Sequence, residues 1–229
     1  MSRFDAVLFD AGGVLVLPDP TVLGPLLAFY GGDPSVALHR RAHYAGMRDK
    51  SHTGSLEGDW LAYDTAYVSA VGVRSGDRAE AAHVLNRTRT ADLWRWPIPE
   101  TIQALRRLAS RGVPMGVVSN ASGQIEGSLK RSVCQVGDGP FVSMRCIVDS
   151  HVVGIEKPDP SIFDHALPHF ADIERSRIAY VGDSVSMDIV ASTAAGLHPI
   201  LIDPYNDHVG ADFERLSSVG VLADELAGA

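Results

Sequence analysis

Short continuous apolar segments recur along the chain and are separated by stretches with helical spacing. Each segment has three or four apolar residues bounded by glycine, proline or polar residues, which predicts a buried strand. These segments are Ala6–Phe9, Met115–Val118, Cys146–Val148, Ile178–Val181 and Pro199–Ile202. Strands that lack polar alternation and are separated by helices are typical of a parallel sheet covered on both faces.

Helical spacing is most extensive between about Thr21 and Leu93, where the sequence contains no convincing strand. One predicted helix carries apolar or aromatic residues on one face at steps of three and four: Leu56, Trp60, Tyr63, Tyr67 and Val71. A second helix begins at Asp77, with Glu80 three residues later in a capping-box spacing. The segment therefore predicts an all-helical unit of roughly seventy residues.

The remaining helices alternate with the strands. They are predicted at Ile102–Leu108 with a stop at Gly112, up to about Lys130, at Pro160–Phe170, and at Met187–Ala195 with a stop at Gly196. Trp94–Pro99 contains two prolines and is predicted to be a linker. The whole pattern predicts a doubly wound, Rossmann-like α/β core at residues 1–17 and 95–229, with an inserted all-helical unit at residues 18–94.

The composition is ordinary for a soluble globular protein, with 45% hydrophobic and 21% charged residues among 229. The formal net charge of −8 argues against a nucleic-acid or anionic-membrane partner, because such a surface repels phosphate groups. A phosphorylated substrate must then be attracted by a local positive group. The sequence has no membrane-spanning stretch and no signal-peptide pattern at its start, so we expect a cytoplasmic protein. We expect it to be a monomer or a homodimer.

Polar residues of matching chemistry follow the predicted strands. Asp10 ends the first strand, Ser119 and Asn120 end the second, and Asp183 follows the strand at Ile178–Val181. In open parallel sheets ligands bind beyond the carboxyl ends of the strands, so we expect these side chains to meet. A carboxylate at this edge can attack phosphorus and form an aspartyl-phosphate.

The other polar residues complete this chemistry. Lys157 can neutralise the nucleophile and the developing negative charge. A hard cation such as Mg²⁺ is expected to bridge the carboxylates and an anionic substrate, and Asp183 can supply one of its oxygen ligands. Asp188, in the first turn of the next helix, can hold a metal-bound water or orient Asp183. Ser119 and Asn120 offer donors for the phosphoryl oxygens.

This ordered set resembles the haloacid dehalogenase-like superfamily of hydrolases. Four segments carry the resemblance: FDAGGVL at residues 9–15, VVSN at 117–120, GIEKPDP at 154–160 and GDSVSMD at 182–188. The helical unit lies where one large branch of the superfamily has a helical cap. The resemblance covers nearly the whole chain and implies a magnesium-dependent phosphatase that forms an aspartyl-phosphate on Asp10.

The resemblance also implies roles for individual residues and a class of substrate. Asp10 and Lys157 are expected to be catalytic, and Gly13, Ser119 and Asn120 to bind the substrate. Mg²⁺ is expected to bind Asp10, Asp183, Asp188 and the backbone carbonyl of Gly12. The substrate is expected to be a small phosphorylated metabolite.

One residue departs from the family pattern. Phosphatases of the superfamily have a second aspartate two residues after the nucleophile, which protonates the leaving alcohol, whereas this chain has Gly12. A general acid contributes roughly 10²- to 10⁴-fold to a rate, so ordinary alkyl phosphates are expected to react slowly. The departure therefore favours esters with better leaving groups, such as sugar 1-phosphates.

Two other functions stay open at this stage. A metal-independent 2-haloacid dehalogenase needs no leaving-group acid, but Asp183 and Asp188 would then face a carboxylate substrate without a cation. A catalytically impaired module could bind a phosphorylated ligand without turnover. A phosphonatase would need a lysine in the helical unit, where Lys50 stands alone and is interpreted as a solvated surface charge. The basic stretch around it, Arg40–His52, is likewise interpreted as a solvated helix face and loop. The alternative is that one or two of its side chains contact the phosphate or the sugar hydroxyls.

Overall fold

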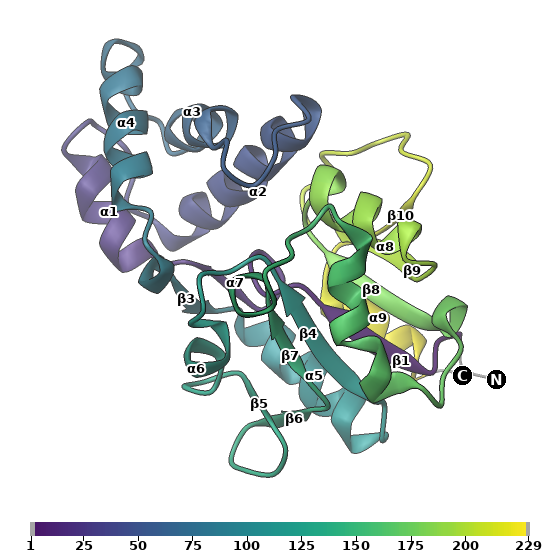
Figure 1. Cartoon of the computed structure of the whole chain (residues 1–229). Helices are drawn as coiled ribbons and strands as arrows, with labels where there is room; N and C mark the ends of the chain where they lie inside the picture. Colours follow the sequence, from purple (N-terminus) through teal and green to yellow (C-terminus); the bar gives the residue numbers. More distant parts are fainter. Residues whose placement is uncertain (1–2, 228–229) are drawn as a thin grey trace.

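A parallel sheet forms the centre of the larger unit in the computed structural model, which describes residues 3–227 (Figure 1). In this part of the chain the sheet has six strands, in the order β10 (Glu214–Leu216), β9 (His198–Ile202), β8 (Ile178–Gly182), β1 (Ala6–Phe9), β4 (Met115–Ser119) and β7 (Ile147–Asp149). Strand β1 pairs in parallel with both β4 and β8. The carboxyl ends of these three strands therefore lie side by side at one edge of the sheet.

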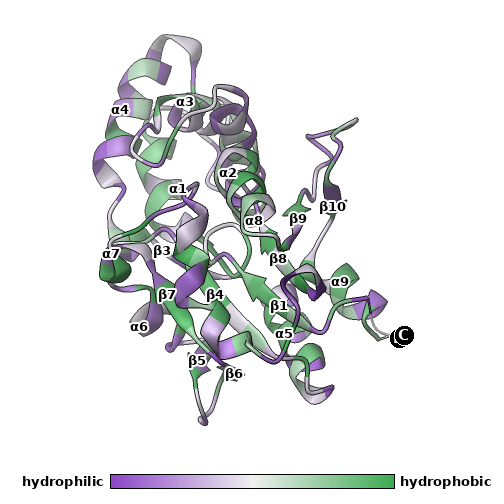
Figure 2. Ribbon diagram, turned by 45° about the vertical axis from the view of Figure 1, so that its right-hand side comes forward, coloured by the Kyte–Doolittle hydropathy of each residue, from purple (hydrophilic) through white to green (hydrophobic). Residues whose placement is uncertain are grey.

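Both faces of the sheet are covered by helices. Along β1, Val7 and Phe9 enter one buried cluster while Ala6 and Leu8 enter another, as the alternation of side chains in a strand requires. Strands β1 and β8, at the middle of the sheet, are accordingly fully buried and mostly apolar (Figure 2). This arrangement confirms the predicted doubly wound α/β sheet. The covering helices are α5 (Pro99–Ser110), α6 (Ile125–Leu129) and α9 (Val219–Glu225) on one face, and the 3₁₀ helices Pro160–His165 and Leu167–Phe170 with α8 (Val190–Ala194) on the other.

Between β1 and β4 in the sequence, the chain forms a second group of helices that lies to one side of the sheet, and we call it the helical insert (Figure 1). Its helices are α1 (Pro20–Ala28), α2 (Val36–His52), α3 (Leu61–Ala70) and α4 (Arg78–Thr88). They enclose a separate buried cluster that includes Leu23, Tyr67 and Leu85. The insert joins the sheet-containing unit through β2 (Val16–Pro18) and β3 (Trp94–Pro97), which pair antiparallel.

Three segments differ from the sequence prediction. Trp94–Pro97 forms a strand rather than a linker, because it pairs with β2. Leu56 lies outside α3, in a loop with glycines on both sides, and is 60% exposed. The segment Pro160–Phe170 forms two short 3₁₀ helices instead of one helix, and Pro168 within it has no N–H to donate to an α-helical turn.

The remaining elements are short. They are β5 (Cys134–Val136), β6 (Val142–Met144), α7 (Ser150–Val153), the 3₁₀ turns Ser75–Asp77, Ala91–Leu93 and Arg175–Arg177, and the π-helical turn Val185–Ile189. Among residues 3–227, no helix combines the length and the hydrophobicity needed to cross a membrane.

Candidate active site

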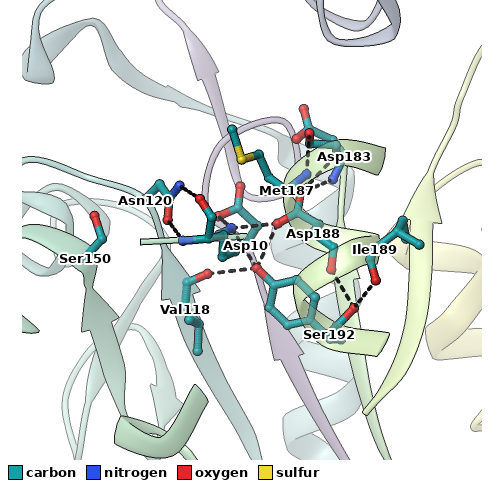
Figure 3. A network of polar contacts seen from close by, with 12 residues as sticks. Asp10, Val118, Asn120, Ser150, Asp183, Met187, Asp188, Ile189 and Ser192 are labelled. Carbon is teal, nitrogen blue, oxygen red and sulfur yellow. Dashed lines mark hydrogen bonds and ion pairs between the residues drawn. The ribbon is translucent and has the colours of Figure 1, made fainter. Parts of the chain in front are cut away.

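Asp10 occupies the centre of the sheet edge. It directly follows β1, and its backbone N–H donates to the carbonyl of Val181 at 2.8 Å. Asp10 is only 7% exposed. Because β4 and β8 flank β1, their ends bring Ser119 and Asp183 beside this carboxylate. The close-up shows Asp10, Asp183 and Asp188 in one network of polar contacts at this edge (Figure 3).

Lys157 makes the principal electrostatic contact in the site. Its Nζ donates to Asp10 Oδ1 at 2.8 Å, to Asp188 Oδ1 at 2.6 Å and to the Tyr180 hydroxyl oxygen at 2.8 Å. Burial alone would lower the pKa of this lysine, but the charges of Asp10 and Asp188 raise its pKa well above the usual range. Lys157 is therefore a fixed positive charge against the predicted nucleophile.

Asp188 is held by several donors. Besides Lys157, the Tyr180 hydroxyl lies 3.0 Å from its Oδ1, and the backbone N–H groups of Asp183 and Ser184 donate to its Oδ2 at 3.0 and 2.9 Å. A β-carbon at Gly182 would lie 2.3 Å from Asp188 Cγ, so glycine allows this close approach. Asp188 thus fixes the turn that presents Asp183.

A group of three buried carboxylates could hold a metal ion. One oxygen each from Asp10, Asp183 and Asp188 lies within 4.8 Å of the others. Burial raises the pKa of Asp10 to about 7, with the neighbouring carboxylates adding to the effect and Lys157 opposing it. Burial also raises the pKa of Asp183. Three carboxylates facing one lysine leave an excess of negative charge that a divalent cation would offset.

Ser119 and Asn120 lie where the sequence predicted, at the end of β4. Both line the same cavity as Asp10 and Lys157. Asn120 Oδ1 accepts from the backbone N–H of Lys157 at 2.8 Å, and its Nδ2 donates to the Lys157 carbonyl at 3.0 Å and to Glu57 Oε2 at 3.1 Å. Asn120 therefore anchors the segment that carries Lys157.

The two glycines after Asp10 have different surroundings. Gly12 lines the cavity, and a β-carbon there would lie 3.1 Å from Trp94 Cζ3. Gly13 has a φ of +67°, and a β-carbon there would lie 1.8 Å from Asp183 Oδ2, so only glycine fits. Its N–H donates to the Val16 carbonyl at 2.8 Å, and its carbonyl accepts from the Tyr44 hydroxyl at 2.6 Å. Substrate binding by Gly13 stays a prediction.

His43 is a site residue that the sequence reasoning missed. It lies on α2, is 1% exposed, and places Nε2 at 2.8 Å from Asp183 Oδ2 and Nδ1 at 3.0 Å from the Tyr63 hydroxyl. The sequence signal was present only as one member of a basic stretch. The packing of α2 against the turn that follows Asp183 brings His43 into the site.

The interpretation of Lys50 as a surface charge was wrong. This residue is 1% exposed, its Nζ lies 3.5 Å from the centre of the Trp60 ring, and it donates to the Glu57 carbonyl at 3.1 Å. Burial lowers the pKa of Lys50. It is not among the residues that line the cavity, as a Schiff-base lysine would need to be.

Other members of the basic stretch connect the insert to the sheet-containing unit. Arg41 and Arg48 both pair with Asp207, at 2.7 and 3.7 Å, and Arg40 pairs with Glu100. The face interpreted as solvated is therefore partly an interface, because the sheet-containing unit supplies acidic partners for it.

A cavity of about 360 Å³ lies between the insert and the strand ends. Its core side contains the carboxylates, Lys157, Ser119 and Asn120. Its other side is formed largely by the insert and β3, which contribute Met47, Glu57, Trp60, Arg89 and Trp94. The cavity is thus charged at the strand ends and partly aromatic on the opposite wall.

The family profile of haloacid dehalogenase-like hydrolases matches residues 4–196. The chain belongs to this family. It is therefore a hydrolase, and the family resemblance proposed from four short segments is confirmed.

Relatives within the family include named phosphatases. A glyceraldehyde 3-phosphate phosphatase of Methanothermobacter thermautotrophicus is 30% identical over 138 residues, which cover 57% of this chain and 58% of that protein. The chain spans between 40% and 58% of the length of several curated relatives that it matches. Their activities are therefore properties of longer or only partly aligned proteins.

Solved structures in the family share the fold over the whole chain. A phosphatase from Thermococcus onnurineus aligns with a TM-score of 0.59 and 21% identity, covering 98% of both chains. A 2-haloacid dehalogenase from Pseudomonas syringae aligns with a TM-score of 0.57 and 21% identity, covering 98% of this chain and 99% of that one. A phosphatase and a dehalogenase thus resemble this fold equally well, so the function must be argued from the site.

Proposed function

We propose that the protein is a magnesium-dependent phosphatase that hydrolyses a small phosphorylated metabolite through an aspartyl-phosphate on Asp10. The observation that carries this proposal is the pairing of a buried aspartate with Lys157, beside two further buried carboxylates. These neighbours suit phosphoryl transfer, because a lysine and a bound cation can offset the negative charge of an aspartate and a phosphate brought together. Phosphatase-named relatives support the same chemistry.

The residues present fit Mg²⁺, which prefers carboxylate, carbonyl and phosphate oxygens. Asp10, Asp183 and the Gly12 carbonyl would hold the ion. Since four donors already engage the oxygens of Asp188, we assign it mainly to orienting Asp183. When bound, Mg²⁺ would offset the carboxylate charge and polarise the phosphoryl oxygens.

The reaction follows from the positions of these side chains. Asp10 attacks phosphorus in line with the bond to the leaving oxygen, and Lys157 stabilises the charge that develops on the phosphoryl group. Ser119 lies beside Asp10 and donates to a phosphoryl oxygen. Water then attacks the phosphorus of the aspartyl-phosphate and regenerates the Asp10 carboxylate.

The helical insert, residues 18–94, acts in this proposal as a cap on the core formed by residues 1–17 and 95–229. It supplies the wall of the cavity opposite Asp10, so it excludes water and contacts the leaving group. The aromatic side chains of Trp60 and Trp94 on this wall suit a ring such as a sugar. A sugar phosphate is therefore our first candidate substrate.

Phosphate release from p-nitrophenyl phosphate, with Mg²⁺ or with EDTA, tests the proposal. Activity should require Mg²⁺ and disappear in Asp10→Asn, and a screen of sugar 1-phosphates, sugar 6-phosphates and phosphoglycolate should then identify the preferred ester. Halide release from 2-chloropropionate in EDTA would instead establish a dehalogenase. Binding of phosphorylated ligands without any turnover would establish an impaired binding module.

A further inference from the structure

The proposed phosphatase reaction requires a proton for the leaving oxygen, and Gly12 cannot provide it. The space beside Gly12 is filled by the Trp94 ring, whose Cζ3 and Cε3 atoms lie 3.1 and 3.3 Å from the position of an added β-carbon. Residue 12 therefore has no acidic side chain, and an added one would press its β-carbon against the Trp94 ring. A donor must come from elsewhere in the cavity.

We propose that Glu57, in the loop between α2 and α3, is the general acid and base of the reaction, an inference that rests on the proposed phosphatase function. Glu57 is half-buried and lines the same cavity as Asp10 and Lys157. Its Oε2 accepts from Asn120 Nδ2 at 3.1 Å. Its carboxyl is thus linked through one side chain to the segment that positions Lys157.

The direction of attack places the leaving group on the Glu57 side. In an in-line displacement the leaving oxygen lies on the far side of phosphorus from the nucleophile. Asp10 projects from the strand edge, so the far side faces the helical insert. Among the described residues lining the cavity, Glu57 is the carboxyl that the insert contributes, since the other carboxyls there come from the sheet-containing unit.

Several contacts fix the loop that carries Glu57. The Lys50 ammonium donates to the Glu57 carbonyl at 3.1 Å and lies over the Trp60 ring. The Ser55 hydroxyl donates to Asp59 Oδ2 at 3.0 Å across the same loop. The buried Lys50 is therefore a positioning residue, because its ammonium group holds the backbone of Glu57.

The proton balance closes with this residue alone. As the bond between phosphorus and the leaving oxygen breaks and the bond from Asp10 forms, the protonated Glu57 gives its proton to the leaving oxygen. The Glu57 carboxylate then takes a proton from the water that attacks phosphorus from the same side. Cleavage of the bond between phosphorus and Asp10 releases phosphate and leaves Glu57 protonated for the next cycle.

Leaving-group dependence distinguishes a proton donor from a substrate contact. The p-nitrophenolate ion leaves readily without protonation, whereas the alkoxide of glycerol 2-phosphate or of a sugar 6-phosphate does not. Glu57→Gln should therefore slow the first step, measured as release of the alcohol in a single turnover, by roughly 10²- to 10⁴-fold on an alkyl phosphate but by less than about tenfold on p-nitrophenyl phosphate. Breakdown of the shared aspartyl-phosphate should slow equally for both esters, because Glu57 is also the base of that step. Glu57→Asp should recover part of the alkyl phosphate activity.

The matched control is Glu80→Gln, which makes the same change on an exposed face of the insert. It should leave both activities unchanged, and thermal unfolding should show that both variants are folded. An equal loss in the single-turnover rate of the first step on both esters in Glu57→Gln, or no loss on either, would overturn the proposal. So would a wild-type enzyme that cleaves p-nitrophenyl phosphate but no alkyl phosphate, although the proposed function would then survive. Absence of activity on every ester would instead refute the proposed function itself.

Discussion

The indole ring of Trp94 lies directly against Gly12, with ring carbon Cζ3 3.1 Å from the point that a β-carbon on residue 12 would occupy. The absence of an aspartate at this position is therefore matched by the packing around it. Gly12 does not have the positive φ found at Gly13, so Trp94, rather than backbone strain, limits what can stand there.

Restoring the family's aspartate should consequently destabilise the protein. Gly12→Asp places a β-carbon against the Trp94 ring and should lower the free energy of unfolding by about 1–3 kcal/mol, as overpacking typically does. Urea denaturation in EDTA measures this change. In the double variant Gly12→Asp/Trp94→Ala the two losses should be less than additive, because the second substitution makes room for the first. Full additivity would show that the two residues do not compete for space.

Metal binding should depend on pH through the buried carboxylates. In the metal-free protein the pKa of Asp10 is raised to about 7, against 3.8 as its reference value, so the folded state binds more protons between these pH values. The stabilisation from this protonation is present below pH 3.8 and is lost as the pH rises through about 7. Because Mg²⁺ must displace that proton, its affinity should be roughly tenfold or more weaker at pH 5.5 than at pH 8.

Thermal unfolding with and without Mg²⁺ at the two pH values measures this dependence. The increase in Tm caused by a fixed Mg²⁺ concentration should be larger at pH 8. An equal increase at both values would mean that the ion binds away from Asp10.

Lys157 should be needed for both stability and activity. Lys157→Met leaves Asp10 and Asp188 without their shared positive partner, which should cost about 3–5 kcal/mol in the metal-free protein near neutral pH. Lowering the pH should recover part of this loss, because Asp10, whose pKa is already raised by burial, then becomes protonated. Chemical denaturation at pH 5.5 and pH 8 tests the sign, with Lys130→Met on the exposed surface as a control. A loss that grew on acidification would contradict the assignment.

The His43 contact should support metal binding. This side chain lies 2.8 Å from Asp183 Oδ2, and removing such a partner of a ligand typically lowers metal affinity or activity by roughly 10- to 100-fold. His43→Ala should raise the Mg²⁺ concentration needed for half-maximal activity by that factor. His83→Ala, an exposed substitution in the same insert, should have no effect. An unchanged Mg²⁺ requirement in His43→Ala would remove His43 from the site.

The sequence predicted which residues lie together at the carboxyl ends of the strands, because these residues are tied to local features. Asp10, Ser119 and Asp183 each follow an apolar strand, and parallel strands must place their carboxyl ends together. Lys157 has a weaker local signal, since no strand precedes it directly and it lies in the loop beyond β7 and α7. Its contact with Asp10 depends on the Asn120 side chain, which holds its backbone.

The insert side of the site could not be predicted in the same way. His43, Lys50 and Glu57 belong to segments whose local pattern is that of a charged surface. What buries them is the packing of α2 and its following loop against Trp60, Tyr63 and the Asp183 turn, and no periodicity reports such contacts. The predicted helix that included Leu56 was wrong at its start, because α3 begins only at Leu61.

The central claim, that Asp10 is the nucleophile, can be tested by trapping the intermediate. Wild-type protein mixed with Mg²⁺ and p-nitrophenyl phosphate is quenched in acid during turnover and then treated with borohydride, which reduces an acyl phosphate to an alcohol. Mass spectrometry of the peptide containing residue 10 should find homoserine in place of Asp10, and Asp10→Asn should give neither turnover nor this product. Turnover with an unmodified Asp10, or with the modification on another residue, would contradict the account.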